Sequence, residues 1–439
     1  MLGICYGQQL TAHLLGGKVL AGKKKELGPA TVSIIQPSPL LSSKKDNLIP
    51  SQFTAWMSHG DDVVAIPPGF LTVARTETIP YAAYENTSKK IFNIQFHPEV
   101  VHTQFGTEIL KNFLTICSIA VKKQTINQES VDNLIANIAD SVSDKKVIAA
   151  LSGGVDSSVA SVLVHKAIGD KLTAIYIDSG LMRQNETIVL ETVFKKHFHM
   201  NVKIVNASKI FLDALKGVVD PEQKRKIIGK IFIDVFETEA KKISADFLMQ
   251  GTIYPDVIES SGTKHADKIK SHHNVGGLPD HMKLTLLEPL RNFYKDEVRT
   301  IGRLVGLPDS VVQRQPFPGP GLATRIIGDI TPYKLDVLRK ADAIVSEEIE
   351  KAGLTQKIWQ SFAVFTGIQT TGVRGDARVY GETIGIRAVE ATDAMSVKWA
   401  RLPYQVLDTI SIRIVNEIKE INRVVYDVTN KPPGTIEWE

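Results

Sequence analysis

The amino-acid sequence predicts an α/β protein whose central part is a doubly wound parallel sheet. Three apolar segments have strand character, and they are Val147–Leu151, Leu172–Ile177 and Val202–Val205. Helical stretches separate these segments, and this alternation favours a parallel sheet with helices on both faces. The polar loops that follow the first two segments, Ser152–Ser158 and Asp178–Gly180, would lie at the carboxyl edge of the sheet, where such proteins bind ligands.

The first part of the chain alternates short strands and loops. Strand character occurs at Ala30–Ile35, Leu71–Arg75 and Ile91–Phe96, and Thr103–Cys117 has the pattern of a closing helix. A polar linker starts at Lys122, so we expect a first domain over residues 1–121. The segment after the linker predicts an amphipathic helix, because its apolar residues repeat at helical spacing. They are Val131, Leu134, Ile135, Ile138, Ala139 and Val142.

A second change of pattern occurs near residue 315. The segment Pro316–Gly321 cannot continue a helix or a central strand, so it is a domain boundary or a mobile lid. We therefore expect a second domain over 122–315 and a smaller α+β domain over 316–439, with helices at Lys334–Gly353 and Tyr404–Arg423. The tail Lys431–Glu439 is either a frayed end or a segment that closes over a ligand.

Composition excludes several classes of protein. The 439 residues correspond to roughly two to four domains. The net charge of +4 is too small to indicate a nucleic-acid partner, and no uninterrupted apolar stretch is long enough to span a bilayer. Two cysteines, Cys5 and Cys117, do not form the pattern of a disulfide framework. We therefore expect a protein of the cytosol with no nucleic-acid or membrane partner.

The loop Ser152-Gly153-Gly154-Val155-Asp156-Ser157-Ser158 has the composition of a phosphate cradle. It lies between a predicted strand and a predicted helix, and glycines there let backbone N–H groups approach an anion at the helix N-terminus. The serine hydroxyls add donors, and Asp156 could reach a magnesium ion on the phosphates. The loop lacks the lysine of the common nucleotide-binding loop. It resembles the loop of ATP pyrophosphatases, which cut ATP to AMP and pyrophosphate; the alternative is an ordinary strand–helix turn.

A second constellation combines Cys5, His97 and Glu99. The segment Gly3–Gly7 has the form of a nucleophile elbow with cysteine as the nucleophile, in which the flanking glycines prevent clashes. His97 and Glu99 are two residues apart across Pro98, so in an extended segment they face the same side. Glu99 would orient His97, and His97 would act as the base toward Cys5. The alternatives are a small buried cysteine and a hydrogen-bonded core histidine.

Together these segments resemble the glutamine-hydrolysing GMP synthases, in which a triad amidotransferase is fused to an ATP pyrophosphatase. The resemblance covers essentially the whole chain. It implies a partial amidotransferase α/β domain over 1–121, an ATP pyrophosphatase domain over 122–315 and a dimerisation and XMP-binding domain over 316–439, where XMP is xanthosine monophosphate. The segments that carry it are Gly3–Gln9, Met57–Asp61, Gln95–Glu99, Ser152–Ser158, Gln250–Ser260, Phe317–Ala323 and Lys431–Glu439.

The resemblance also implies the chemistry. Cys5, His97 and Glu99 would hydrolyse glutamine, and the freed ammonia would pass to the second site. There ATP, with Mg²⁺ on its phosphates, would adenylate the C2 oxygen of XMP, and ammonia would displace AMP to give GMP. Adenylation suits this step because a carbonyl oxygen is a poor leaving group.

The same resemblance assigns residues to the second site. The ATP loop would use Ser152, Gly153, Gly154, Val155, Asp156, Ser157 and Ser158. Asp256 and Glu259 would face the nucleotide; the alternative is a strand-end turn with solvated carboxylates. Basic side chains suit the XMP phosphate, and Glu437 suits the purine N–H groups. The XMP set is Arg225, Gln360, Arg423, Lys431, Thr435, Ile436 and Glu437.

The chain departs from the family at its start, because family members carry further amidotransferase strands ahead of the cysteine. Those strands include a glycine-rich loop that donates one oxyanion N–H, and losing one such donor costs about 2.7–4 kcal/mol of transition-state stabilisation. We therefore expect an N-terminally truncated chain that hydrolyses glutamine poorly and uses free ammonia. The family resemblance further implies a homodimer through the C-terminal domain.

Other functions were weighed against this interpretation. A synthetase that uses only ammonia and a nucleotide-binding regulator with a decayed amidotransferase half are the alternatives. Other ATP pyrophosphatases, such as NAD synthetase, lack the Cys5 module and the tail in this form. The adjacent His272 and His273 have poor spacing for metal ligands and are expected to be loop residues near the active site.

Overall fold

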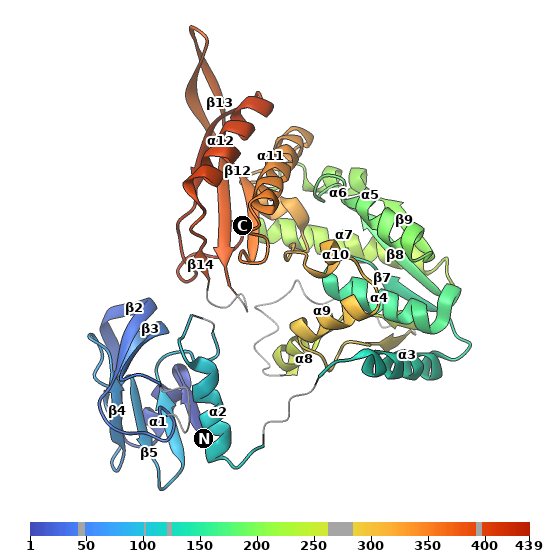
Figure 1. The fold of residues 1–439 in the computed structure, drawn as a ribbon. Coiled ribbons are helices and arrows are strands. Elements are labelled where there is room, and N and C mark those ends of the chain that lie inside the picture. Colours follow the sequence, from blue (N-terminus) through green and yellow to red (C-terminus); the bar gives the residue numbers. More distant parts are fainter. Residues whose placement is uncertain (43–48, 101, 121–124, 262–283, 392–396) are drawn as a thin grey trace. The chain divides into compact units, whose positions relative to one another are not determined.

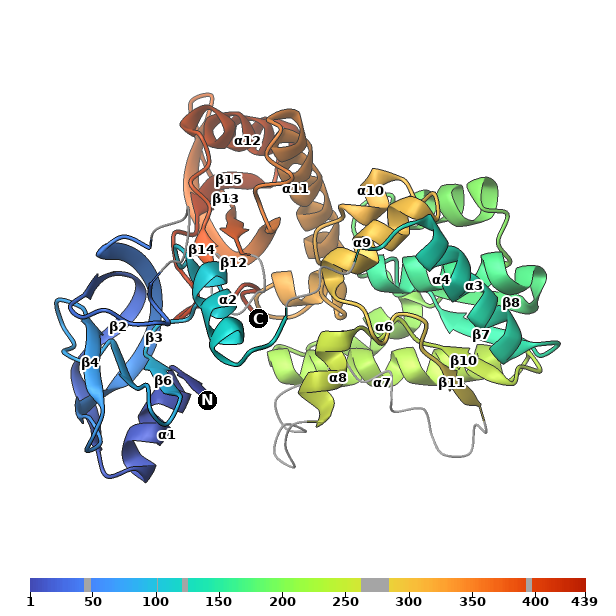
Figure 2. The same ribbon diagram turned by 60° about the horizontal axis from the view of Figure 1, so that its bottom comes forward.

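The structure is a computed structural model that describes residues 1–42, 49–100, 102–120, 125–261, 284–391 and 397–439 (Figures 1 and 2). It forms two compact units. The first comprises Met1–Gln124, Val389–Trp399 and Val428–Ile436, and the second comprises Thr125–Ala388, Ala400–Asp427 and Glu437–Glu439. The domain boundaries at 121/122 and 315/316 stay a prediction.

The first unit is built on a six-stranded sheet with the order β1-β6-β5-β4-β2-β3. The short β1 runs parallel to β6, and the other pairs are antiparallel. The predicted strands appear, but the first is part of a much longer β2, which pairs with β3 in a bulged ribbon. The elements are β1 (Leu2–Ile4), α1 (Tyr6–Leu14), β2 (Lys18–Ile34), β3 (Gln52–Ala65), β4 (Leu71–Arg75), β5 (Ala83–Asn86), β6 (Ile91–Ile94) and α2 (Gly106–Ile116).

The second unit contains an entirely parallel five-stranded sheet with the order β11-β10-β7-β8-β9. Its strands are β7 (Val147–Ala150), β8 (Leu172–Asp178), β9 (Val202–Asn206), β10 (Phe247–Met249) and β11 (Thr285–Leu287). Its helices are α3 (Gln128–Val142), α4 (Val155–Ile168), α5 (Glu186–Leu190), the π-helix η2 (Glu191–His197), α6 (Ser208–Leu215), α7 (Pro221–Ala240), α8 (Tyr254–Ser261), α9 (Lys295–Leu304) and α10 (Asp309–Val312).

Helices cover both faces of this sheet, as the sequence predicts. Successive residues of β7 point to opposite sides. Val147 and Ala149 pack in a core with α3 and α4, whereas Ile148 packs in a core with α6 and α7. Figures 1 and 2 show α3 and α9 against α4.

A third sheet follows in the chain, and β13 is its central strand. β12 and β14 flank β13 in the sheet order, and β15 runs parallel to β13. Two helices, α11 and α12, pack against each other and against β12 and β15 (Figure 1). The elements are α11 (Pro332–Lys351), β12 (Gln360–Arg374), β13 (Ala377–Glu390), β14 (Lys398–Trp399), α12 (Tyr404–Glu417) and β15 (Ile421–Tyr426).

One predicted boundary is wrong. The sequence predicts a helix over Tyr404–Arg423, but α12 ends at Glu417 and Arg423 lies in β15. The helix stops because Ile418 is already extended, and the β-branched Ile421, Val424 and Val425 suit a strand beside β13.

The segment Pro316–Gly321 is a packed connection at its end. It leads into a short 3₁₀ helix, η5 (Gly321–Arg325), whose residues are all buried. Gly321 has φ 65°, and the N–H of Leu322 donates to the carbonyl of Leu181 at 2.8 Å. This anchoring argues against the mobile-lid alternative. Within the described ranges, no helix is long and apolar enough to cross a membrane.

Gly321→Ala is expected to destabilise the second unit by about 1–3 kcal/mol more than Gly353→Ala does. Both glycines have positive φ, but a Cβ on Gly321 would overlap the Leu181 backbone, and one on Gly353 would meet no atom within 4 Å. Urea denaturation followed by circular dichroism measures the difference. Equal losses in the two variants would show that close packing at Gly321 does not matter.

Two candidate active sites

Cys5 occupies a strained turn between β1 and α1. Its φ is 50° and its ψ is −108°, a conformation that non-glycine residues rarely adopt. Its N–H donates to the carbonyl of Ile94 at 2.9 Å, since β1 lies beside β6. A Cβ on Gly3 would lie 2.8 Å from the carbonyl oxygen of Gly7, whereas one on Gly7 would meet no atom within 4 Å. The elbow therefore requires Gly3, and the expectation that Gly7 also prevents a clash is wrong.

His97 is oriented by Glu99, as the i, i+2 spacing predicts. Nδ1 of His97 lies 2.7 Å from Oε1 of Glu99. The other ring nitrogen, Nε2, is buried and has no hydrogen-bond partner within the described residues. The Cys5 thiol is close to the ring but outside hydrogen-bonding geometry; together, Cys5 and Glu99 raise the pKa of His97 to about 10. The structure thus brings the three predicted residues together, with Nε2 as the nitrogen left for Cys5.

Gln95 contacts the nucleophile, a role that the sequence reasoning missed. Its Nε2 lies 3.6 Å from Sγ of Cys5, and its Oε1 lies 3.4 Å from Nε2 of the buried Gln9. The signal was the spacing, because Gln95 and His97 are two apart and share a face of the extended chain. The Cys5 thiol itself donates to the carbonyl of Ser58 at 3.6 Å.

The second site begins where β7 ends, at the loop Ser152–Ser158. Gly154 caps α4, and Gly153 has φ 75°, so the N-terminus of a 14-residue helix opens at the carboxyl edge of the sheet. The hydroxyls of Ser152 and Ser157 lie 2.9 Å apart. Val155 and Ser158 are buried instead, and the Ser158 hydroxyl has no hydrogen-bond partner in the described part of the chain.

Two cations from distant segments lie at this loop, and the sequence reasoning missed both. Nζ of Lys295, at the start of α9, lies 2.7 and 2.6 Å from the two carboxylate oxygens of Asp156. Nη1 of Arg314 donates to the carbonyl of Gly153 at 3.0 Å, and Arg314 pairs with Glu186. The loop therefore has basic side chains beside it although its own sequence has none. No local signal in the sequence marked either residue.

The neighbourhood of the loop offers few oxygen ligands for a cation. Among the residues that the structure describes, no group of three or more histidines, cysteines or carboxylates could hold a metal ion. Asp156 and the hydroxyls of Ser152 and Ser157 are the oxygen donors on the loop itself. This set fits a Mg²⁺ ion that is held mainly by nucleotide phosphates and one carboxylate.

Asp256 lies in the first turn of α8, which follows β10 and its Gln250–Ile253 connection. Its Oδ2 accepts a hydrogen bond from the N–H of Ile253 at 3.0 Å, so in this structure it caps the helix. Glu259 is in the same helix, but its side chain is outside the described set, as are His272 and His273. The predicted roles of Asp256 and Glu259 toward the nucleotide stay predictions.

The residues predicted to bind XMP are spread over several elements. Gln360 begins β12, is buried, and donates to Oε1 of Glu437 at 2.8 Å. Arg225 lies on α7, 3.5 Å from Glu222, and Arg423 is exposed on β15. The other three, Lys431, Thr435 and Ile436, belong to the first unit.

The end of the chain is anchored, so the frayed-end alternative is wrong. Arg325 binds the carboxylate of Glu437 through two hydrogen bonds of 3.0 Å. Nε1 of Trp438 donates to Asp427 at 2.9 Å. Glu439 pairs with Lys224 and accepts a hydrogen bond from the N–H of Gly328 at 3.3 Å.

Comparisons with known proteins agree with this division of labour. The class-I glutamine amidotransferase family matches residues 1–117, the NAD synthase family matches 126–229, and the GMP synthase C terminal domain family matches 347–438. The order of these matches is the order predicted from the sequence.

Curated proteins named glutamine-hydrolyzing GMP synthase match along the whole chain. The protein of Clostridium botulinum (strain Loch Maree) is 54% identical and that of Clostridium novyi (strain NT) is 56% identical, each over 100% of this chain and 85% of the relative. A crystal structure of a GMP synthase component from Thermoplasma acidophilum is 34% identical over 27% of this chain and 56% of that chain, and its TM-score of 0.25 supports no argument. The whole-chain identity shows that this chain belongs to the glutamine-hydrolyzing GMP synthase family.

Proposed function

We propose that this chain makes GMP from XMP and ATP, with glutamine or ammonia as the nitrogen donor. The observation that carries the proposal is the presence, in one chain, of an assembled Cys5–His97–Glu99 triad and a phosphate cradle followed by the domain typical of GMP synthases. AMP and pyrophosphate are the other products. An ammonia-only synthetase and a regulator remain distinguishable from it by the first experiment below.

In the first site, Cys5 acts as the nucleophile. Its sulfur attacks the amide carbon of glutamine, and Nε2 of His97 takes the thiol proton and returns it to the departing ammonia. Water then attacks the thioester and releases glutamate. Glu99 holds Nδ1 of His97, so that Nε2 faces the reacting atoms. The N-terminus of α1 would stabilise the negative charge that develops on the carbonyl oxygen.

Cys5→Ala is expected to abolish GMP synthesis from glutamine and to leave synthesis from ammonium chloride unchanged, because only the first step needs the thiol. Steady-state assays of GMP formation with each donor measure this. The ratio of the two wild-type rates also tests the expectation of weak glutamine hydrolysis. Loss of both activities in the variant would contradict independent sites, and ammonium giving no GMP from the folded wild type would favour the regulator.

The rate of glutamine hydrolysis is expected to fall as the pH rises through about 10, because His97 then loses the proton that it must give to ammonia. Glu99→Gln removes a carboxylate that raises the pKa of His97, so the alkaline limb should move to lower pH. The pH profile of glutamate release measures the shift, and the ammonium-driven rate of the same variant is the control. An unmoved limb would contradict the role of Glu99.

In the second site, the C2 oxygen of XMP attacks the α-phosphorus of ATP and pyrophosphate leaves. Ammonia then adds to C2 and AMP leaves. The cradle formed by Gly153, Gly154 and the hydroxyls of Ser152 and Ser157 would hold the phosphates. Lys295 and Arg314 supply positive charge beside that cradle. We infer that Mg²⁺ accompanies ATP with Asp156 as a ligand, where it would neutralise phosphate charge.

Lys295→Met is expected to lower kcat/KM for ATP by about tenfold or more, because a charge-assisted contact to phosphate is lost. Lys295→Arg should retain more of the activity. Ammonium-driven AMP formation at varied ATP concentration measures the effect. Lys340→Met, which removes an exposed lysine paired with Asp336, is the matched control. The same kcat/KM in the Lys295→Met and Lys340→Met variants would contradict a role for Lys295.

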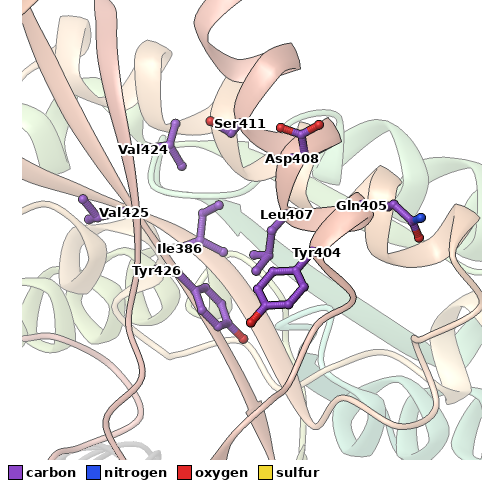
Figure 3. A pocket seen from close by; sticks show the side chains of 9 residues that line it. All are labelled: Ile386, Tyr404, Gln405, Leu407, Asp408, Ser411, Val424, Val425 and Tyr426. Carbon is purple, nitrogen blue, oxygen red and sulfur yellow. The ribbon is translucent and has the colours of Figure 1, made fainter.

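We also propose a homodimer through the C-terminal domain in the cytosol. Apolar side chains are exposed there: Tyr404 of α12 is 91% exposed and Val425 of β15 is 40% exposed. Both line an open pocket of about 530 Å³ that also contains Leu407, Val424 and Tyr426 (Figure 3). Such a surface favours burial against a second copy. The nucleophile Cys5, which is free, would need a reducing compartment.

A further inference from the structure

The last three residues of the chain are held by two buried cations of the second unit. The side chains of Lys224 and Arg325 are both fully buried. A buried charge is costly unless it is paired and hydrogen-bonded. In this structure the pairing carboxylates are Glu439 and Glu437. The position of the tail is therefore tied to the interior of the unit.

Arg325 determines how the Glu437 carboxylate points. Its Nε and Nη2 each donate to a different oxygen of that carboxylate, and this two-point contact fixes the plane of the group. The guanidinium group is itself placed over the ring of Phe362, with its centre 4.0 Å from the ring centroid. Gln360, another residue proposed to bind XMP, also donates to Glu437. Glu437 is thus oriented before any nucleotide arrives.

Lys224 performs the equivalent task two residues later. Its ammonium group pairs with Glu439 and donates to the carbonyl of Ile326 at 2.8 Å. Burial lowers the pKa of Lys224, and Glu439 opposes that shift because it favours the charged form. Lys224 precedes Arg225 on α7, so one helix turn connects the end of the chain with a residue proposed to bind the XMP phosphate.

We propose that Lys224 and Glu439 are a positioning pair for XMP: the buried ammonium group holds the final side chain and thereby keeps Glu437 in place for the purine ring. The inference rests on the proposed function, in which Arg225, Gln360 and Glu437 belong to the XMP site. Neither Lys224 nor Glu439 needs to touch the substrate. Their effect is specific to XMP, because the ATP cradle lies on separate elements, at the end of β7 and the start of α4.

Glu439→Gln tests the proposal in the complete protein without any C-terminal extension. The substitution keeps the size of the side chain and removes its charge. The KM for XMP in the ammonium-driven reaction is expected to rise by about tenfold or more, which is the effect of losing one charge-assisted hydrogen bond. The KM for ATP should change by less than about twofold. Calorimetric titration with XMP should show the same weakening.

Variants of Lys224 and a control on the same helix complete the design. Lys224→Met should reproduce the XMP defect, Lys224→Arg should restore part of the affinity, and the double variant should be no worse than Lys224→Met alone. Lys241→Met, which removes an exposed lysine that pairs with Glu237 on α7, should leave both KM values unchanged. Melting curves check that each variant is folded; if Lys224→Met does not fold, Glu439→Gln alone decides.

Two results would overturn the proposal. An unchanged KM for XMP in Glu439→Gln would show that the pair does not position the site. Equal rises in the KM values for XMP and ATP would show a general structural role. Failure of the proposed function is a separate outcome, because it would appear as absence of GMP from the unaltered protein with XMP, ATP and ammonium.

Discussion

Two buried positive charges, Lys224 and Arg325, constrain the C-terminal part of this protein. Breaking a buried ion pair by removing one partner costs about 3–5 kcal/mol, so each cation requires its carboxylate. Those carboxylates are Glu439 and Glu437, at the end of the chain. The fold of the second unit therefore depends on the tail, and the tail depends on the fold. This mutual dependence explains why a segment rich in proline and charge is ordered.

The two candidate active sites use one structural device for different chemistry. In each, a strand of a sheet ends and a helix begins within a few residues, so that backbone N–H groups at the helix N-terminus are free for a ligand. After β1, a strained non-glycine residue presents the nucleophile Cys5. After β7, glycine at the positive φ position leaves space for an anion. A side chain at the turn favours covalent catalysis, and its absence favours phosphate binding.

Features that depend on neighbouring residues could be predicted from the sequence. Alternating strands and helices predicted the parallel sheet, β4 has the predicted bounds, and the spacing of His97 and Glu99 predicted their contact. Where local patterns compete, prediction failed: β15 was taken as the end of a helix because its apolar residues also suit helical spacing.

Contacts between distant residues were beyond local patterns. Lys295 is 139 residues from Asp156, Arg325 is 112 residues from Glu437, and Lys224 is 215 residues from Glu439. Each of these basic residues looks like an ordinary solvated charge in sequence. Only the folded chain shows that it is paired. The family resemblance supplied the overall chemistry, whereas the charges that support it came from the structure.

The central claim is that ATP activates the C2 oxygen of XMP before nitrogen arrives. XMP labelled with ¹⁸O at C2 tests it most directly, in a reaction with ATP, magnesium and ammonium chloride. The account predicts that the label leaves with the adenylate, so mass spectrometry should find one ¹⁸O atom in each AMP and none in pyrophosphate. Label in pyrophosphate or in water, with unlabelled AMP, would contradict adenylation at that oxygen.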